Sequence, residues 1–231
     1  MSEAKPRFVV IVGTDTGVGK TLVTRALAHA LRAAGKRVLG IKPIETGILP
    51  GEEASSDAAL LAVATGQTSP TAALIRLKDP LTPALAAERE GVTIDIDAIA
   101  AEIRKLGEGY DVVLVEGAGG VLSPLSWTAD ATTLAHRLGE ERVLLVASDR
   151  LGTLSLTHTA VQCLLDTWLH PIAIVLSAPA EPDASTGTNA DALRRRLSPY
   201  ADVSQKIVLV PRVAAAQDAA AALADVVRWI G

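Results

Sequence analysis

Short apolar runs alternate along the chain with longer stretches in which apolar residues recur at helical spacing. The runs at 9–12, 38–41, 112–115, 143–147, 172–176 and 207–210 predict buried strands. Helical spacing predicts helices over 22–31, 58–66, 94–106, 153–165, 190–197 and 214–230. This alternation predicts an α/β fold in which helices cover both faces of a mainly parallel β-sheet, an αβα arrangement of three layers. Because no linker interrupts the pattern, we expect a single domain over 1–231.

The first predicted strand enters a glycine-bearing turn and leaves it as a helix, through Gly13-Thr14-Asp15-Thr16-Gly17-Val18-Gly19-Lys20-Thr21. Phosphate oxygens require several N–H donors and a cation, which the amides of this turn, the helix dipole and Lys20 supply. The turn is therefore a P-loop, lengthened because Gly13 stands one residue early, and the fold is P-loop NTPase-like. A plain connecting turn is the alternative, which a Gly-Lys-Thr at a helix start disfavours. The predicted nucleotide ligands are Gly17, Val18, Gly19, Lys20, Thr21 and Leu22.

Three charged residues stand near the ends of other predicted elements. Lys42 follows a predicted strand that ends at Pro43, so it lies at the carboxyl end of the sheet, where parallel sheets bind ligands. It is therefore either a ligand-binding residue or a solvated charge at a strand end. Asp57 begins a helix, either as its N-cap or as a carboxylate that faces Mg2+. Glu116 stands at the carboxyl end of a buried strand, where an ionised side chain needs a partner such as Mg2+. A polar strand end with a flexible turn is the alternative there.

The glycine-rich turn after this strand, and the predicted metal site, complete the nucleotide pocket. Glycine lets backbone approach a ligand closely. The predicted ligands from this turn are Gly117, Ala118 and Gly119, and the predicted Mg2+ ligands are Thr21, Asp57 and Glu116. The proline-punctuated segment 79–83 is expected to form a loop that walls the substrate site.

Composition and charge narrow the function classes. The formal net charge is -4, which does not favour nucleic acid or an anionic membrane surface as a partner. The cluster Arg194-Arg195-Arg196 lies in a predicted helix and is interpreted as a solvated face. A lone Cys163 cannot form a disulfide within the chain, and no apolar run is long enough to span a bilayer, so we expect a cytoplasmic location. The four histidines lack metal-ligand spacing.

Four sequence blocks together resemble the dethiobiotin synthetase family, over most of the chain. They are the lengthened P-loop, Lys42-Pro43-Ile44-Glu45-Thr46-Gly47, Ser56-Asp57-Ala58 and Val115-Glu116-Gly117-Ala118-Gly119-Gly120. The resemblance implies a homodimeric ligase of biotin synthesis, with its substrate site at the subunit interface. It implies that ATP, Mg2+, CO2 or bicarbonate and 7,8-diaminononanoate meet at the strand ends, where a carbamate forms, is phosphorylated and closes to the cyclic urea.

The resemblance also assigns roles to single residues. It implies that Lys20 and Lys42 neutralise phosphate and carbamate charge, that Thr16 contacts the carbamate or diamine, and that Thr46 does the same. The segment predicted to receive the substrate carboxylate consists of Gly152, Thr153, Leu154 and Ser155. The residues expected to border the nucleotide base are Pro211, Arg212 and Val213.

Three positions depart from the family pattern. Gly17 stands where some members have Glu, and Ser155-Leu156 replaces an Asn-His pair. Ser177-Ala178 replaces an Asn-Asp pair that reads adenine in some members, so we expect ATP with relaxed use of other nucleoside triphosphates.

Two other enzyme classes and one inactive class compete with this interpretation. Glutamine-dependent amidotransferases need a second domain with a catalytic cysteine, for which the chain has no length. Partition and cell-division switch ATPases share the fold class, but their P-loop usually carries a lysine where this chain has Asp15. A catalytically inactive P-loop protein is disfavoured by the intact lysines and carboxylates.

Overall fold

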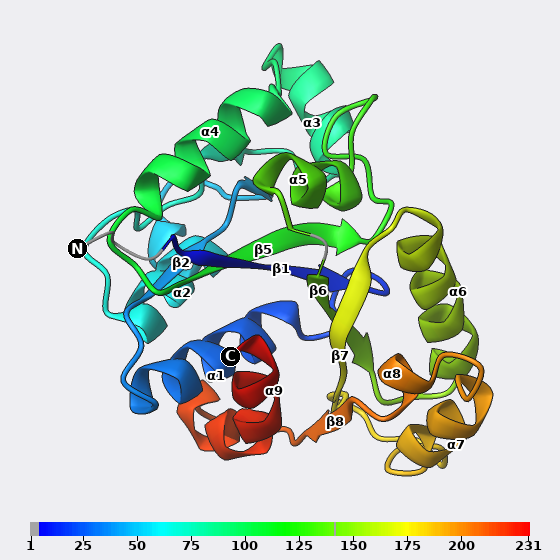
Figure 1. Cartoon of the computed structure of the whole chain (residues 1–231). Helices are drawn as coiled ribbons and strands as arrows, with labels where there is room; N and C mark the ends of the chain where they lie inside the picture. The colour runs from blue at the N-terminus through cyan, green and yellow to red at the C-terminus, as the bar shows by residue number, and fades with distance from the viewer. Residues whose placement is uncertain (1–4, 141) are drawn as a thin grey trace.

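The computed structural model describes residues 5–140 and 142–231 and is built around a six-stranded sheet (Figure 1). The strand order is β2-β5-β1-β6-β7-β8, and every neighbouring pair is parallel. The strands are β1 (Arg7–Gly13), β2 (Val38–Ile41), β5 (Val112–Gly120), β6 (Arg142–Ser148), β7 (His170–Ser177) and β8 (Ile207–Val210). The predicted parallel sheet is therefore confirmed.

Helices cover both faces of this sheet, which confirms the three-layer prediction (Figure 1). One face packs on α1 (Lys20–Ala33), α2 (Asp57–Thr65), the 3₁₀ helix η2 (Ala216–Leu223) and α9 (Ala224–Ile230). The other packs on α3 (Pro83–Glu90), α4 (Ile96–Leu106), α5 (Ala131–Leu138), α6 (Thr153–Asp166), α7 (Asn189–Arg196) and α8 (Ala201–Ser204). Among the described residues, none of the helices has the length and apolar character needed to cross a lipid bilayer.

Successive residues of the central strands point into different cores. Val113 and Val115 of β5 lie in the core beneath α4 and α5, whereas Val112 and Leu114 lie in the core beneath α1. Side chains alternate across a strand, and both faces of this sheet are covered, so both sets must be apolar. This explains why the strands read as uninterrupted apolar runs in the sequence.

Four local features differ from the sequence predictions. A small parallel sheet of β3 (Ile44–Thr46) and β4 (Ile75–Leu77) follows Pro43, where the pattern was too short to predict strands. The helices α3, α5 and α8 were not predicted: Pro83 opens α3 instead of prolonging a loop, a capping box from Asp130 and Thr133 starts α5, and α8 is a single short turn. The predicted final helix over 214–230 is 3₁₀ in its first half. A short 3₁₀ turn, η1 (Glu53–Ser55), precedes α2.

Strand β5 also extends further than its apolar run. The sequence predicts that Glu116 ends this strand, but the strand continues to Gly120, and Glu116 lies opposite Ile11 of β1. The pairing is irregular between Ile11 and Gly13, where Gly13 pairs with Gly120. The glycines of this extension fit where other residues would not, because Gly119 has φ +71° and a Cβ on Gly120 would lie 3.3 Å from the Thr14 carbonyl oxygen. Glu116 consequently points into the protein and is fully buried.

Candidate active site

The P-loop connects β1 to α1 with a backbone that only glycines accommodate easily. Gly17 has φ +73° and Gly19 has φ +96°, both in the left-handed region. A Cβ atom on Gly13 would lie 2.8 Å from the Asp15 carbonyl oxygen and 2.9 Å from Lys20 Nζ. The early glycine that marks the lengthened loop therefore leaves space for the Lys20 side chain.

Lys20, the first residue of α1, folds its ammonium back over the P-loop. Its Nζ donates to the carbonyl oxygens of Asp15 at 3.0 Å and Gly119 at 2.7 Å, so it links the P-loop to the end of β5. Burial and the positive charge of Lys42 lower the pKa of Lys20 to about 8, although nearby carboxylates partly oppose them. An anion bound next to Lys20 would favour its protonated form, so this position suits an anionic ligand.

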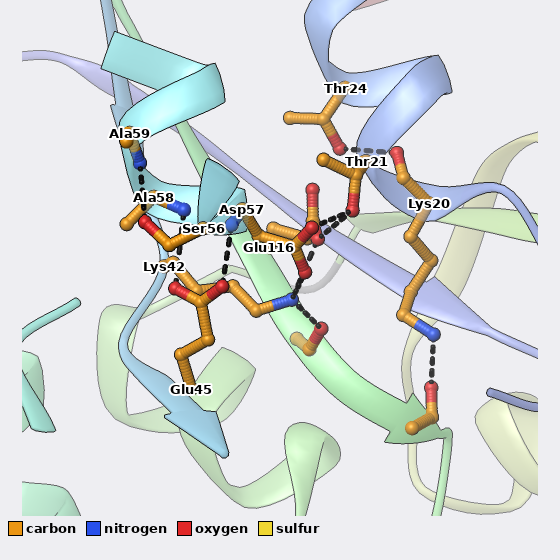
Figure 2. A network of polar contacts seen from close by, with 12 residues as sticks. Lys20, Thr21, Thr24, Lys42, Glu45, Ser56, Asp57, Ala58, Ala59 and Glu116 are labelled. Carbon is orange, nitrogen blue, oxygen red and sulfur yellow. Dashed lines mark hydrogen bonds and ion pairs between the residues drawn. The ribbon is translucent and has the colours of Figure 1, made fainter. Parts of the chain in front are cut away.

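Lys42 lies in a polar network with residues from three other elements (Figure 2). Its Nζ is 2.7 Å from Oε1 of Glu116 and 2.8 Å from Oδ2 of Asp57. The Thr21 hydroxyl lies within hydrogen-bond distance of the same two carboxylates, 2.9 Å from Glu116 and 2.8 Å from Asp57, and donates its one proton to either of them. The interpretation of Lys42 as a solvated charge is wrong, because the residue is only 5% exposed.

Electrostatics keep Lys42 charged despite its burial. Burial alone would lower the pKa of Lys42, but the carboxylates of Glu116 and Asp57 outweigh it and hold the pKa above the ordinary value. In the same way, burial would raise the pKa of Asp57, and the charge of Lys42 and hydrogen bonds from Lys42 and Thr21 lower it instead. The cluster therefore contains an ammonium that does not act as a base near neutral pH.

The start of α2 orients Asp57 toward this cluster. Ser56, not Asp57, is the N-cap, since its hydroxyl oxygen accepts from the amide of Ala59 at 3.1 Å. The interpretation of Asp57 as the N-cap is therefore wrong, and its carboxylate is available for Thr21 and Lys42. The sequence block Ser56-Asp57-Ala58 separates the capping side chain from the functional one.

The donor set of this cluster fits a divalent cation. Oε2 of Glu116 is buried and has no hydrogen-bond partner, while the oxygens of Asp57 and the Thr21 hydroxyl lie beside the same network. Mg2+ prefers oxygen ligands and uses one or two carboxylates together with substrate phosphates. Thr21, Asp57 and Glu116 could hold such an ion. This set combines two carboxylates with one hydroxyl, and the described residues contain no group of three His, Cys, Asp or Glu side chains suited to a metal.

An open cavity of 910 Å³ joins the P-loop to this cluster. It brings together twelve predicted site residues, namely Thr16, Gly17, Gly19, Lys20, Thr21, Leu22, Lys42, Thr46, Asp57, Glu116, Ala118 and Gly119. One wall is formed by residues 80–83, where the sequence predicts a substrate-binding wall, although Pro83 already belongs to α3.

Known proteins place this arrangement in a family. A family model described as AAA domain matches residues 7–217. The ATP-dependent dethiobiotin synthetase BioD of Anaeromyxobacter sp. (strain Fw109-5) is 40% identical over 177 residues, which cover 77% of this chain and 79% of that protein. The protein of the same name from Aromatoleum aromaticum is 36% identical over 93% of this chain and 95% of its own length. The chain belongs to the dethiobiotin synthetase family.

Membership confirms the predicted family and its enzyme class, an ATP-dependent ligase. A solved structure of the cell division ATPase MinD from Pyrococcus furiosus has a similar fold, with a TM-score of 0.59 and 16% sequence identity, over 97% of this chain and 99% of that one. Identity this low shows the fold alone. It confirms the predicted P-loop NTPase-like architecture.

Some residues that the dethiobiotin synthetase resemblance implicates lie elsewhere. The described lining of the 910 Å³ cavity does not include Gly152, Thr153, Leu154 or Ser155, which start α6, nor Pro211, Arg212 and Val213, which follow β8. Val18 is buried in the core beneath α1, and Gly117 is buried with its carbonyl 3.4 Å from Lys42 Nζ. Ser177 lies against the P-loop, since a Cβ on Gly19 would be 2.5 Å from its Oγ.

Sequence reasoning did not assign a role to Glu45. This residue of the dethiobiotin synthetase block 42–47 lines the cavity and is 6% exposed. Burial raises its pKa, although backbone hydrogen bonds from Asp57 and Ala58 partly oppose this. Its position three residues after Lys42 was visible in the sequence, but its partners on α2 depend on the tertiary fold.

Proposed function

We propose that the protein converts 7,8-diaminononanoate, CO2 and ATP into dethiobiotin, ADP and phosphate, with Mg2+. The observation that carries this proposal is the buried Lys42 ammonium, held between Asp57 and Glu116 in the cavity that also contains the P-loop. Family membership supports the same overall reaction. A switch ATPase needs a P-loop, but nothing in nucleotide hydrolysis alone requires a second buried ammonium at this place.

The reaction divides into three steps that conserve atoms. One amine nitrogen adds to the carbon of CO2 and loses a proton, which gives a carbamate. A carbamate oxygen attacks the γ-phosphorus and ADP leaves. The second amine then attacks the carbamoyl carbon and loses a proton, and phosphate leaves, which closes the urea ring. Each step develops or moves negative charge, so catalysis depends on positioning and charge neutralisation.

The two lysines are assigned to this charge. Because Lys42 remains protonated, it is assigned to stabilise the negative charge of the carbamate and does not accept the proton of the amine. Lys20 and the amides of the P-loop bind the phosphates. When bound by Thr21, Asp57 and Glu116, Mg2+ would supply further positive charge to the phosphate oxygens. Thr16 and Thr46 face the same cavity and are assigned to the carbamate or diamine.

The substrate tail is assigned to the start of α6 in a second copy of the chain. Gly152, Leu154 and Ser155 are exposed and lie outside the cavity lining of their own chain. Free amides at a helix N-terminus suit a carboxylate. This supports a homodimer in which each α6 completes the other subunit's site. A cytoplasmic location remains a prediction.

The nucleotide base is assigned to the surface between the P-loop and the segment 211–213. Ser177 packs against Gly19, and the amide of Ala178 donates to the Val210 carbonyl at 3.0 Å, so neither side chain offers the amide and carboxylate of an Asn-Asp pair. We therefore expect weak discrimination between ATP and other nucleoside triphosphates.

Product mass tests the proposal. The purified protein is incubated with 7,8-diaminononanoate, bicarbonate and Mg2+, with ATP or CTP or both, and dethiobiotin is measured. Lys42→Ala is expected to lower its formation about 100-fold or more, because a preorganised charge is lost. Lys36→Ala, at an exposed lysine, serves as the control and is expected to be active. Circular dichroism establishes that both variants are folded.

Two results would contradict these assignments. ATP hydrolysis that is independent of the diamine, without dethiobiotin, would favour a switch ATPase, the class whose fold the chain shares. Product with ATP but none with CTP would reject relaxed base selectivity and leave the reaction itself supported.

A further inference from the structure

Glu45 is a buried carboxylate in the lining of the candidate active site, and its two carboxylate oxygens face the start of a helix. It lies in β3, and its two oxygens accept from two successive backbone amides, those of Asp57 and Ala58, the latter at 3.2 Å (Figure 2). These amides belong to the first turn of α2, where the backbone N–H groups have no acceptors within the helix. Glu45 therefore fastens β3 to the start of α2.

The first turn of α2 is satisfied by two side chains with separate tasks. The Ser56 hydroxyl accepts from the amide of Ala59, the third in the turn, and Glu45 accepts from the first two. A carboxylate is also favoured electrostatically at a helix N-terminus. The backbone of Asp57 is thus fixed by a residue from a different strand, in addition to the ordinary N-cap.

Lys42 and Glu45 hold Asp57 from two sides. The ammonium of Lys42 is 2.8 Å from the Asp57 carboxylate, while the carboxylate of Glu45 accepts from the Asp57 amide. Only two residues separate Lys42 from Glu45 in the chain, and one of them is Pro43, whose φ is fixed by its ring. The segment 42–45 consequently sets both the position of the Asp57 backbone and the direction of its side chain.

We propose that Glu45 is a positioning residue, which holds Asp57 so that its carboxylate meets Thr21 and the divalent cation that accompanies the nucleotide. The assignment of Asp57 to that cation rests on the proposed function. Glu45 itself does not contact the substrate or the ion in this role. Because Glu45 acts through the geometry of Asp57, its replacement should weaken ADP binding in the presence of Mg2+ and leave ADP binding without Mg2+ unchanged.

Glu45→Gln tests this role, because glutamine has the same size but only one acceptor oxygen. Its NH2 group would then oppose one of the two amide N–H groups, which leaves a buried donor without a partner. Calorimetry of ADP binding is carried out with and without Mg2+. The variant is expected to lose about tenfold in affinity with Mg2+ and to bind as the natural protein does without it.

Hydrogen exchange gives a second readout that needs no nucleotide. The peptide that contains the amides of Asp57 and Ala58 is expected to exchange about tenfold faster in Glu45→Gln. Glu53→Gln is the matched control, since Glu53 is an exposed glutamate in η1, just before α2, and it should change neither measurement. Glu45→Asp keeps the charge but is one methylene shorter, and is expected to recover part of the Mg2+-dependent affinity.

The two readouts separate the possible roles. Faster exchange with an unchanged Mg2+ effect on ADP affinity would reduce Glu45 to a helix cap and overturn the proposal, and so would natural behaviour in both measurements. If Glu45→Gln does not fold, Glu45→Asp decides on the same two readouts. Neither readout depends on dethiobiotin formation, so failure of the proposed function is recognised separately by the product assay.

Discussion

Lys20 and Lys42 lie in one cavity, yet their ammonium groups have opposite surroundings. Lys42 pairs with two carboxylates, which keep its pKa above the ordinary value despite burial, whereas Lys20 donates to two carbonyl oxygens and burial lowers its pKa to about 8. In the proposed nucleotide complex, phosphate oxygens would supply the anionic partner of the Lys20 ammonium. At the residue scale, Lys20 thus suits an incoming anion, whereas Lys42 is kept charged and in place by Asp57 and Glu116.

Nucleotide binding should therefore depend on pH through Lys20. Its lowered pKa means that the unbound protein loses this proton as the pH rises through about 8. Phosphate binding requires the proton, so ADP affinity should fall by up to about tenfold between about pH 7 and about pH 9, with proton uptake near pH 8. Calorimetry in buffers of different ionisation enthalpy measures both quantities.

The sign for stability is opposite to that for binding. Between about pH 8 and the ordinary lysine value, the unfolded chain holds a proton that the folded chain has released, so this residue's contribution to the free energy of unfolding increases with pH. Lys20→Ala is the control for the binding measurement, because it should bind weakly and without proton uptake. Equal affinity at both pH values would contradict the assignment of Lys20 to phosphate.

At the element scale, the turn between β1 and α1 offers two glycines with similar backbone angles and different surroundings. Gly17 has nothing within 4 Å of an added Cβ, whereas a Cβ on Gly19 would lie 2.5 Å from Ser177 Oγ. Gly17→Ala should cost about 1–2 kcal/mol of the free energy of unfolding from its left-handed backbone alone. Gly19→Ala should cost roughly 1–3 kcal/mol more, through overpacking against β7.

Urea denaturation measures both costs. Ser177→Gly, which removes the atoms that a Cβ on Gly19 would meet, should recover part of the loss in Gly19→Ala and none in Gly17→Ala. Equal costs at the two glycines would mean that the P-loop and β7 are not in close contact.

The sequence predicts an element only where the element leaves a pattern in its own residues. The long apolar runs predict the six parallel strands, and Gly19-Lys20-Thr21 predicts the P-loop, because strand burial and phosphate binding each leave a continuous pattern. The three-residue strands β3 and β4 leave no such pattern. These two strands pair only because the tertiary fold brings them together. The contact between Glu45, which lies in β3, and the start of α2 depends on the same fold, so the sequence alone could not predict it.

The extent of β5 shows the same limit. Apolar residues predict a strand as far as Val115, but pairing of Gly13 with Gly120 extends it, and this depends on β1 lying alongside. The residue types at the site were predictable from charge beside buried strands. Their mutual contacts, such as the sharing of two carboxylates by Lys42 and Thr21, required the fold.

At the scale of the whole molecule, the sheet separates two apolar cores, and β6 carries a matched pair of probes. Leu144 faces the core beneath α1 and α9, Leu145 faces the core on the other side, and both are fully buried. Leu144→Ala and Leu145→Ala should each cost about 2–5 kcal/mol of the free energy of unfolding. If 1–231 is one domain, each should shift a single urea transition.

Two tryptophans report on the two sides. Trp229 packs against the core beneath α1, and the exposed Trp127 lies beside α3. In proteins that keep only Trp127 or only Trp229, with Trp168 also replaced, fluorescence should show coincident transitions in each leucine variant. A transition that moves for one tryptophan and not for the other would mean that the two faces unfold separately.

The pairing of Lys42 with Asp57 and Glu116 also affects how a nucleotide reaches the site. The two lysines share their cavity with three carboxylates, including Glu45, and the chain as a whole has a net charge of -4. Such a molecule has no cationic surplus that would attract a free nucleotide over a distance. Encounter should consequently be governed by ordinary diffusion, and the less negative magnesium complex of the nucleotide should be captured faster than the free anion.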